Sequence, residues 1–137
     1  MQEQEKALRV ALVAHAGQTQ RNGSPYIFHP IRVMEGVKGH QAKCVALLHD
    51  VVEDSAMTIE DLDKDFTNRI VKAVDLLTKK KGQNYQEYIE AIAKNDIARR
   101  VKRSDLRDNM DISRLPEVTT KDIERLNKYK EAYEYLR

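Results

Sequence analysis

One stretch of the chain, residues 42 to 54, combines the character of a buried helix with a run of ionisable side chains. Residues 42 to 48 are apolar apart from Lys43, and Val51 and Val52 extend the apolar character. A helix that is apolar on nearly every side is normally buried. The same stretch also carries four ionisable residues, His49, Asp50, Glu53 and Asp54. Because burying an unpaired charge costs several kcal/mol, these groups need a partner, and a bound divalent cation is the simplest candidate.

The composition favours one globular domain spanning residues 1–137. A chain of 137 residues is long enough for one hydrophobic core and short for two. The net charge is only +2 and the charges are interspersed, so we expect no nucleic-acid partner. The single cysteine, Cys44, favours a reducing compartment, and no apolar run approaches the ~18 residues of a membrane span. We therefore expect a cytoplasmic protein without a signal peptide or membrane segment.

Apolar residues recur at helical spacing along the chain, and no segment shows the alternation of a β-strand. Two segments, beginning at Thr58 and Thr119, have the spacing of a capping box at a helix start. We expect an all-α fold of about seven or eight helices. They cover residues 3–16, 30–39 and 41–53, and begin again after Thr58, Thr67 and Asn84, at Asp96, and after Thr119.

Two further polar residues are predicted to point inward. Asp105 lies four residues after Val101 and eight after Ile97, which places it on the apolar face of its helix. His29 follows a short apolar segment at the start of another helix. Taken alone, Asp105 is equally well explained as a cap or salt-bridge partner, and a His-Asp pair late in a helix as a local hydrogen bond.

Together, two histidines and two aspartates from three helices predict a metal site formed by His29, His49, Asp50 and Asp105. Imidazole and carboxylate ligands without cysteine suit Mn²⁺, Fe²⁺ or Zn²⁺. Four protein ligands on a six-coordinate ion leave two positions for water and a substrate oxygen. Such a site suits the hydrolysis of phosphate esters or anhydrides.

The same four residues resemble the H…HD…D signature of HD-domain phosphohydrolases. Within that superfamily, residues 17–30 (GQTQRNGSPYIFHP) resemble the hydrolase domain of RelA/SpoT-type enzymes, residues 49–54 (HDVVED) resemble their HDxxED motif, and Asp105 with Asn109 resembles their Asp and Asn pair. The resemblance covers residues ~3 to ~113. It implies a compact HD-domain helical bundle that acts as a small stand-alone alarmone hydrolase of the stringent response. It further implies Mn²⁺-dependent removal of the 3′-pyrophosphate from ppGpp, pppGpp or ppApp.

The chain departs from the family pattern at two places. Gln20-Arg21 stands where the family usually has Arg-Lys, and the first of those residues contacts the base in the family. The family's Asp-Arg-Leu-His-Asn becomes Asp-Leu-Arg-Asp-Asn at residues 105–109. The metal ligands are retained, whereas the substrate pocket differs.

Chemistry and resemblance together suggest roles for the remaining candidates. Glu53 and Asp54 can orient water or move its proton, and by resemblance Glu53 is the essential acid/base. Gln20, Arg21 and Asn109 are the candidate substrate-binding residues, with Arg21 suited to phosphate. The alternatives are a solvated helix end for the two carboxylates, a lone loop arginine, and helix packing for Asn109.

Three functions remain open at this point. They are the alarmone pyrophosphohydrolase, an HD phosphohydrolase for another nucleotide or phosphate ester, and a non-catalytic nucleotide-sensing module. The first two act on a small-molecule nucleotide or phosphate ester. Among the other histidines, His15 is expected in the core and His40 on the surface.

Overall fold

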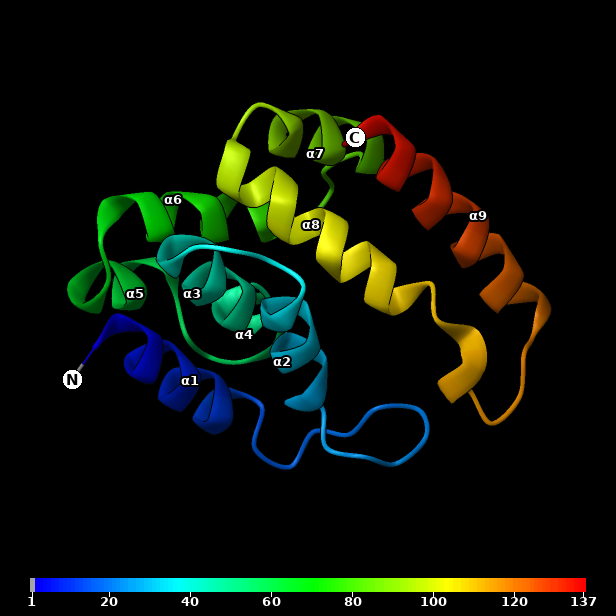
Figure 1. Cartoon of the computed structure of the whole chain (residues 1–137), viewed down its shortest axis with the longest axis horizontal. Helices are drawn as coiled ribbons and strands as arrows, with labels where there is room; N and C mark the ends of the chain where they lie inside the picture. The colour runs from blue at the N-terminus through cyan, green and yellow to red at the C-terminus, as the bar shows by residue number, and fades with distance from the viewer. Residues whose placement is uncertain (1) are drawn as a thin grey trace.

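The computed structural model describes residues 2–137, and within this range the chain is all-helical (Figure 1). The helices are α1 (Glu3–Ala14), α2 (Phe28–Glu35), α3 (His40–Leu48), α4 (Val51–Asp54), α5 (Ile59–Asp65), α6 (Asn68–Leu77), α7 (Tyr85–Ala93), α8 (Asp96–Asn109) and α9 (Thr120–Tyr135), with a 3₁₀ turn at Ile112–Arg114. The all-α prediction is confirmed. None of these helices within residues 2–137 combines the length and the apolar character needed to cross a membrane.

Helix α3 forms the centre of the fold. It packs against α1, α2, α6 and α8, and every residue from Cys44 to Leu48 is buried. Helix α8 crosses the molecule next to it, and α9 runs back along the outer side of α8 (Figure 1). The prediction that residues 42 to 48 have almost no solvent-facing side is therefore confirmed.

The helix starts follow the capping residues of the sequence. Thr58 and Thr119 each form the predicted capping box, and Asn84 accepts hydrogen bonds from two backbone N–H groups of α7. Thr67 precedes α6, but its hydroxyl makes no capping hydrogen bond. Helix α2 begins at Phe28, so Pro30 lies within its first turn, where a missing N–H is tolerated.

The helix predicted over residues 41–53 is interrupted. α3 ends at Leu48 and α4 begins at Val51, with Asp50 between them at φ −105°, ψ 0°. The His49 side chain donates from Nδ1 to the Ala46 carbonyl oxygen at 2.6 Å, and thereby competes with the backbone donors that would continue the helix. On a continuous helix, adjacent side chains point about 100° apart. The interruption lets His49 and Asp50 turn toward the same point.

A close contact between α2 and α8 fixes how these two helices meet. The Ser104 hydroxyl donates to the Val33 carbonyl oxygen at 2.8 Å. A Cβ atom on Gly36 would lie 2.3 Å from the Ser104 Oγ atom, so a larger residue at this position would displace the Ser104 hydroxyl from the contact. The contact places α2 and α8, which carry His29 and Asp105, close together.

Candidate metal centre

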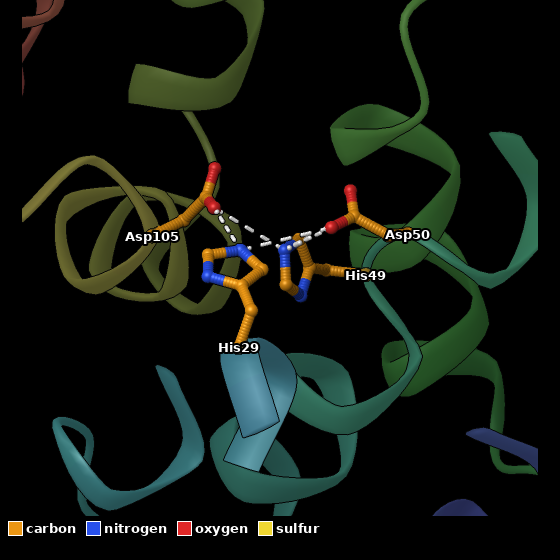
Figure 2. A group of neighbouring side chains, drawn as sticks. All are labelled: His29, His49, Asp50 and Asp105. Atoms are coloured by element: carbon orange, nitrogen blue, oxygen red, sulfur yellow. Dashed lines mark hydrogen bonds and ion pairs between the residues drawn. The ribbon is translucent and has the colours of Figure 1, made fainter. Parts of the chain in front are cut away.

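The structure brings the four predicted metal ligands together. His29 comes from α2, His49 and Asp50 from the break between α3 and α4, and Asp105 from α8; the four side chains point toward one another (Figure 2). One potential ligand atom from each lies within 4.8 Å of all the others. The His29 Nε2 atom is 2.8 Å from Asp105 Oδ1, and the His49 Nε2 atom is 2.9 Å from Asp50 Oδ2. This spacing is suited to one shared cation.

The orientation of His49 supports the fit to a cation. Its Nδ1 atom is occupied by the Ala46 carbonyl oxygen, so Nε2 is the nitrogen that faces the cluster. Although Nε2 lies 2.9 Å from Asp50 Oδ2, it is buried without a hydrogen-bond partner. A buried nitrogen without a hydrogen bond, beside two carboxylates, is in the position expected of a metal ligand.

His29 is held at both ring nitrogens by carboxylates. Its Nε2 atom faces Asp105, and its Nδ1 atom lies 2.6 Å from Asp108 Oδ2. Asp108 was not among the residues predicted for the site. Its position three residues after Asp105 puts it on the same side of α8, which is a signal in the sequence, but its partner on α2 lies 79 residues away.

The two predicted carboxylate ligands each have further partners. Asp105 Oδ2 accepts from Lys102 Nζ at 2.8 Å, and Asp105 Oδ1 accepts from Asn109 Nδ2 at 3.1 Å. Asp50 Oδ2 accepts from the Tyr26 hydroxyl at 2.5 Å. Lys102 and Tyr26 were also not predicted. These contacts fix the direction in which each carboxylate faces the cluster.

The surroundings keep the carboxylates ionised. Burial opposes ionisation of Asp50, but the neighbouring His49 outweighs it and holds the pKa of Asp50 at about 2. Burial likewise opposes ionisation of Asp105, whereas Lys102 and His49 lower its pKa well below the usual range. The same attraction, against burial, raises the pKa of His29 and His49. Without a cation, the histidines therefore favour protonation and balance the two aspartates.

Glu53 and Asp54 lie on α4, beside the cluster and more exposed than its members. Glu53 Oε1 accepts from the Lys79 backbone N–H at 2.6 Å. Partial burial raises the pKa of Glu53, and burial together with the charge of Asp50 raises that of Asp54. A carboxyl group with a raised pKa is better suited to accept and return a proton near neutrality.

A pocket of about 280 Å³ opens beside His29. All three predicted substrate-binding residues line this pocket. The lining residues are Thr19, Gln20, Arg21, Asn22, Tyr26, His29, Asp108, Asn109, Asp111, Arg114 and Leu115. That these residues bind a substrate stays a prediction, as do the metal-binding and catalytic roles.

All three predicted substrate-binding side chains are already engaged, Asn109 through its hydrogen bond to Asp105. Gln20 Oε1 accepts from Arg32 at 2.7 Å, and Gln20 Nε2 donates to the Ser24 hydroxyl at 2.7 Å. Arg21 forms a two-pronged ion pair with Asp122 of α9. The loop before α2 is thus tied to both α2 and α9.

The remaining histidines lie as predicted. His15 is buried, and its Nδ1 atom is 2.9 Å from Gln18 Oε1. His40 is exposed and pairs with Glu3 at 2.9 Å. Neither takes part in the cluster.

An all-helical bundle in which His, His-Asp and Asp from three separate places in the chain point toward one another defines the HD class of domains. A family model described as "HD domain" matches residues 7–113, and the chain belongs to this family. HD-domain hydrolases are metal-dependent, and the cluster is the possible metal-binding site of this chain.

Curated relatives of the chain are alarmone enzymes. A guanosine-3′,5′-bis(diphosphate) 3′-pyrophosphohydrolase of Vibrio cholerae is 39% identical over 90 residues, which are 63% of this chain and 13% of the relative. One of the same name from Aquifex aeolicus is 32% identical over 121 residues, 80% of this chain and 17% of the relative. The bifunctional (p)ppGpp synthase/hydrolase SpoT of Escherichia coli is 35% identical over 94 residues, 66% of this chain and 13% of the relative. The chain thus spans less than a fifth of the length of these relatives.

A solved structure is similar over the whole chain. It is described as a metazoan ortholog of SpoT that hydrolyses ppGpp and plays a role in starvation responses. The TM-score is 0.85 at 26% sequence identity, with 100% of this chain and 86% of that chain covered. The expected HD-domain bundle is therefore confirmed.

Proposed function

We propose that this chain is a metal-dependent nucleotide pyrophosphohydrolase that removes the 3′-pyrophosphate of ppGpp-type alarmones, with Mn²⁺ as its metal. The observation that carries the proposal is that the candidate metal site and the pocket share a residue. Four candidate ligand atoms lie within 4.8 Å of one another, and one of their residues, His29, also lines the pocket that holds Gln20, Arg21 and Asn109. The curated relatives named for this activity support the substrate class.

In this proposal, different residues bind the metal and transfer the proton. His29, His49, Asp50 and Asp105 would hold the metal, which supplies a Lewis acid for phosphoryl oxygens and lowers the pKa of water. Glu53 accepts a proton from the attacking water and can pass it to the leaving oxygen, as its raised pKa favours. Asp54 assists in orienting that water. The absence of cysteine from the ligand set and the two carboxylates favour Mn²⁺ among the candidate metals, with Fe²⁺ or Zn²⁺ as alternatives.

The pocket side of the site positions the nucleotide. Arg21 and Arg114 supply cationic groups at the pocket wall, and Asn109 offers an amide next to Asp105. Arginine binds phosphate through two parallel donors, so these side chains suit the phosphates of a nucleotide. Arg21 is shared with Asp122 and would have to be shared again with, or released to, the substrate.

A second candidate is an HD phosphohydrolase that acts on another nucleotide. Both polar ends of the Gln20 amide are already bonded, to Arg32 and to Ser24, which limits the groups that this position offers to guanine. The same observation favours weak selectivity between bases. A non-catalytic nucleotide sensor is disfavoured because a sensor has no need of both a complete ligand set and Glu53.

The test is a substrate screen of purified, Mn²⁺-loaded protein against nucleotides with and without a 3′-pyrophosphate. The proposal predicts release of pyrophosphate from ppGpp that stops when Mn²⁺ is chelated. Turnover only of a nucleotide that lacks the 3′-pyrophosphate would replace the proposal with the second candidate. Binding of ppGpp without turnover of any nucleotide would favour the sensor.

A further inference from the structure

The side chain of Asp108 joins the candidate metal centre to the pocket. Its Oδ2 atom lies 2.6 Å from His29 Nδ1, and its Oδ1 atom accepts from Arg32 Nε at 2.7 Å. Arg114 lies 3.2 Å from the same Oδ1 atom. The carboxylate is only 11% exposed, and the guanidinium groups of Arg32 and Arg114 beside it can only donate hydrogen bonds. Asp108 is therefore a fixed, ionised acceptor behind His29.

We propose that Asp108 is the positioning residue of the metal centre: it holds His29 with a proton on Nδ1, so that the Nε2 lone pair is directed at the cation. This inference rests on the metal site of the proposed function. A neutral imidazole has two tautomers, and only one of them presents a lone pair at Nε2. Because an ionised carboxylate can only accept a hydrogen bond, Asp108 selects the tautomer with Nδ1–H.

The contacts on the other side of Asp108 keep it in place. His29 and Arg32 lie three residues apart on α2 and face the same side of the helix, so one carboxylate from α8 reaches both. Arg32 also donates to Gln20 Oε1 at 2.7 Å, in the loop that lines the pocket. A connected row of hydrogen bonds thus runs from Gln20 through Arg32 and Asp108 to His29.

This row joins the two places where the chain departs from the family motifs. Gln20 is one of them, and Asp108 occupies the fourth position of the altered segment at residues 105–109. Arg32 bonds to both, so the two departures are physically coupled in this chain. An asparagine at position 108 could accept from only one of His29 Nδ1 and Arg32, because the other end of its amide is a donor.

The experiment measures Mn²⁺ affinity by the loss of the free-ion signal in electron paramagnetic resonance. Removing the partner that orients a metal-bound histidine typically weakens affinity by about 10–100-fold, and Asp108→Asn should do the same. Asp111→Asn is the matched control: Asp111 lines the same pocket and pairs with Arg114, without reaching His29. It should change the affinity by less than about 3-fold, well below the range for an orienting partner.

Equal affinities of the Asp108→Asn and unaltered proteins would overturn the inference, as would an equal loss in Asp111→Asn. Either result leaves the proposed hydrolase standing, provided that the unaltered protein binds Mn²⁺ and hydrolyses ppGpp. Failure of the unaltered protein to bind Mn²⁺ would overturn the proposed function and this inference together.

A second measurement needs no variant and covers the case in which Asp108→Asn does not fold. Zn²⁺ is diamagnetic and accepts the same ligand types, so ¹⁵N NMR of the Zn²⁺-loaded protein reports the state of each imidazole nitrogen. We expect His29 to carry a slowly exchanging proton on Nδ1 and to bind through Nε2. Binding through Nδ1, or an unprotonated Nδ1, would contradict the role of Asp108.

Discussion

His49 and His29 reach the same point from two different surroundings. His49 lies in the apolar core at the end of α3, and a backbone carbonyl three residues earlier holds its Nδ1 atom. His29 lies at the wall of the pocket, and a side chain from another helix, 79 residues away in the sequence, holds its Nδ1 atom. The orientation of His49 thus follows from the local backbone, whereas that of His29 depends on a particular distant residue. The pocket side of the site is consequently the side on which substitutions can adjust the metal centre.

The largest difference between the two histidines should appear in the metal-free protein. His49→Ala leaves Asp50 with the Tyr26 hydroxyl and with the longer contact of 3.7 Å to His29 Nε2, and breaking a buried ion pair costs about 3–5 kcal/mol. His29→Ala leaves Asp105 paired with Lys102 and Asp108 paired with Arg32, so its cost should be smaller. Urea unfolding of both variants without metal measures the two costs. An equal loss of unfolding free energy in the two variants would contradict the difference described between the surroundings of His49 and His29.

Glu53 lies on α4, close in sequence to His49 and Asp50, and tests the catalytic step and not metal binding. Glu53→Gln should lower the turnover of ppGpp by about 10²–10⁴-fold, the usual cost of removing a positioned acid/base, and leave Mn²⁺ affinity nearly unchanged. Asp108→Asn should show the opposite pattern and lower the affinity for Mn²⁺ before it lowers turnover. The control is Glu60→Gln, at an exposed position on α5, which should alter neither quantity. Unaltered turnover in Glu53→Gln would show that activation of water needs only the metal.

The raised pKa of both histidines predicts two opposite pH dependences: the stability of the metal-free protein should fall as the pH rises, and the affinity for Mn²⁺ should increase. In the metal-free protein, their ion pairs contribute fully to stability below the ordinary histidine pKa of about 6.5, and this contribution is lost as the pH rises through the raised values. Metal binding requires the protons to leave Nε2, so Mn²⁺ affinity should rise with pH, up to about tenfold per unit for each proton displaced. Calorimetry in buffers of different ionisation enthalpy counts those protons. An affinity that does not change between pH 6 and pH 8 would contradict the description of the cluster.

The smallest effect concerns base selectivity on the pocket side. Because Arg32 and Ser24 occupy the Gln20 amide, we expect kcat/KM for guanosine and adenosine 3′-pyrophosphates to differ by less than ~100-fold, about 2.7 kcal/mol. Gln20→Arg should increase the preference for guanosine, since a guanidinium can stack on a purine. A preference above that limit in the unaltered protein would mean that Gln20 or another residue reads the base.

The same contrast explains how much of the molecule could be predicted from its sequence. The inward direction of Asp105 followed from its spacing after Val101, and both capping boxes followed from local patterns. Local patterns also indicated His29 and the His49-Asp50 pair, and the four residues do converge. The local signals each lie within about two helical turns of the chain, whereas the convergence itself joins residues as distant as His29 and Asp105.

The features that could not be predicted depend on contacts between distant segments or on a side chain that competes with the backbone. Asp108 is recognisable only when α2 lies against α8, and the ion pair of Arg21 joins residues 101 positions apart. The interruption at His49 escaped prediction because periodicity reports which residues are buried. It does not report that an imidazole takes the carbonyl oxygen of Ala46.

The break between α3 and α4 also sets a limit on engineering this chain for heat resistance. Extending α3 without interruption through Asp54 would add backbone hydrogen bonds at the centre of the fold, a common route to a more stable protein. The same change would turn Asp50 about 100° away from His49 and take apart the cluster that gives the chain its chemistry. Thermostabilising substitutions in this chain therefore belong on the outer helices, and the central helix has to keep its irregular end.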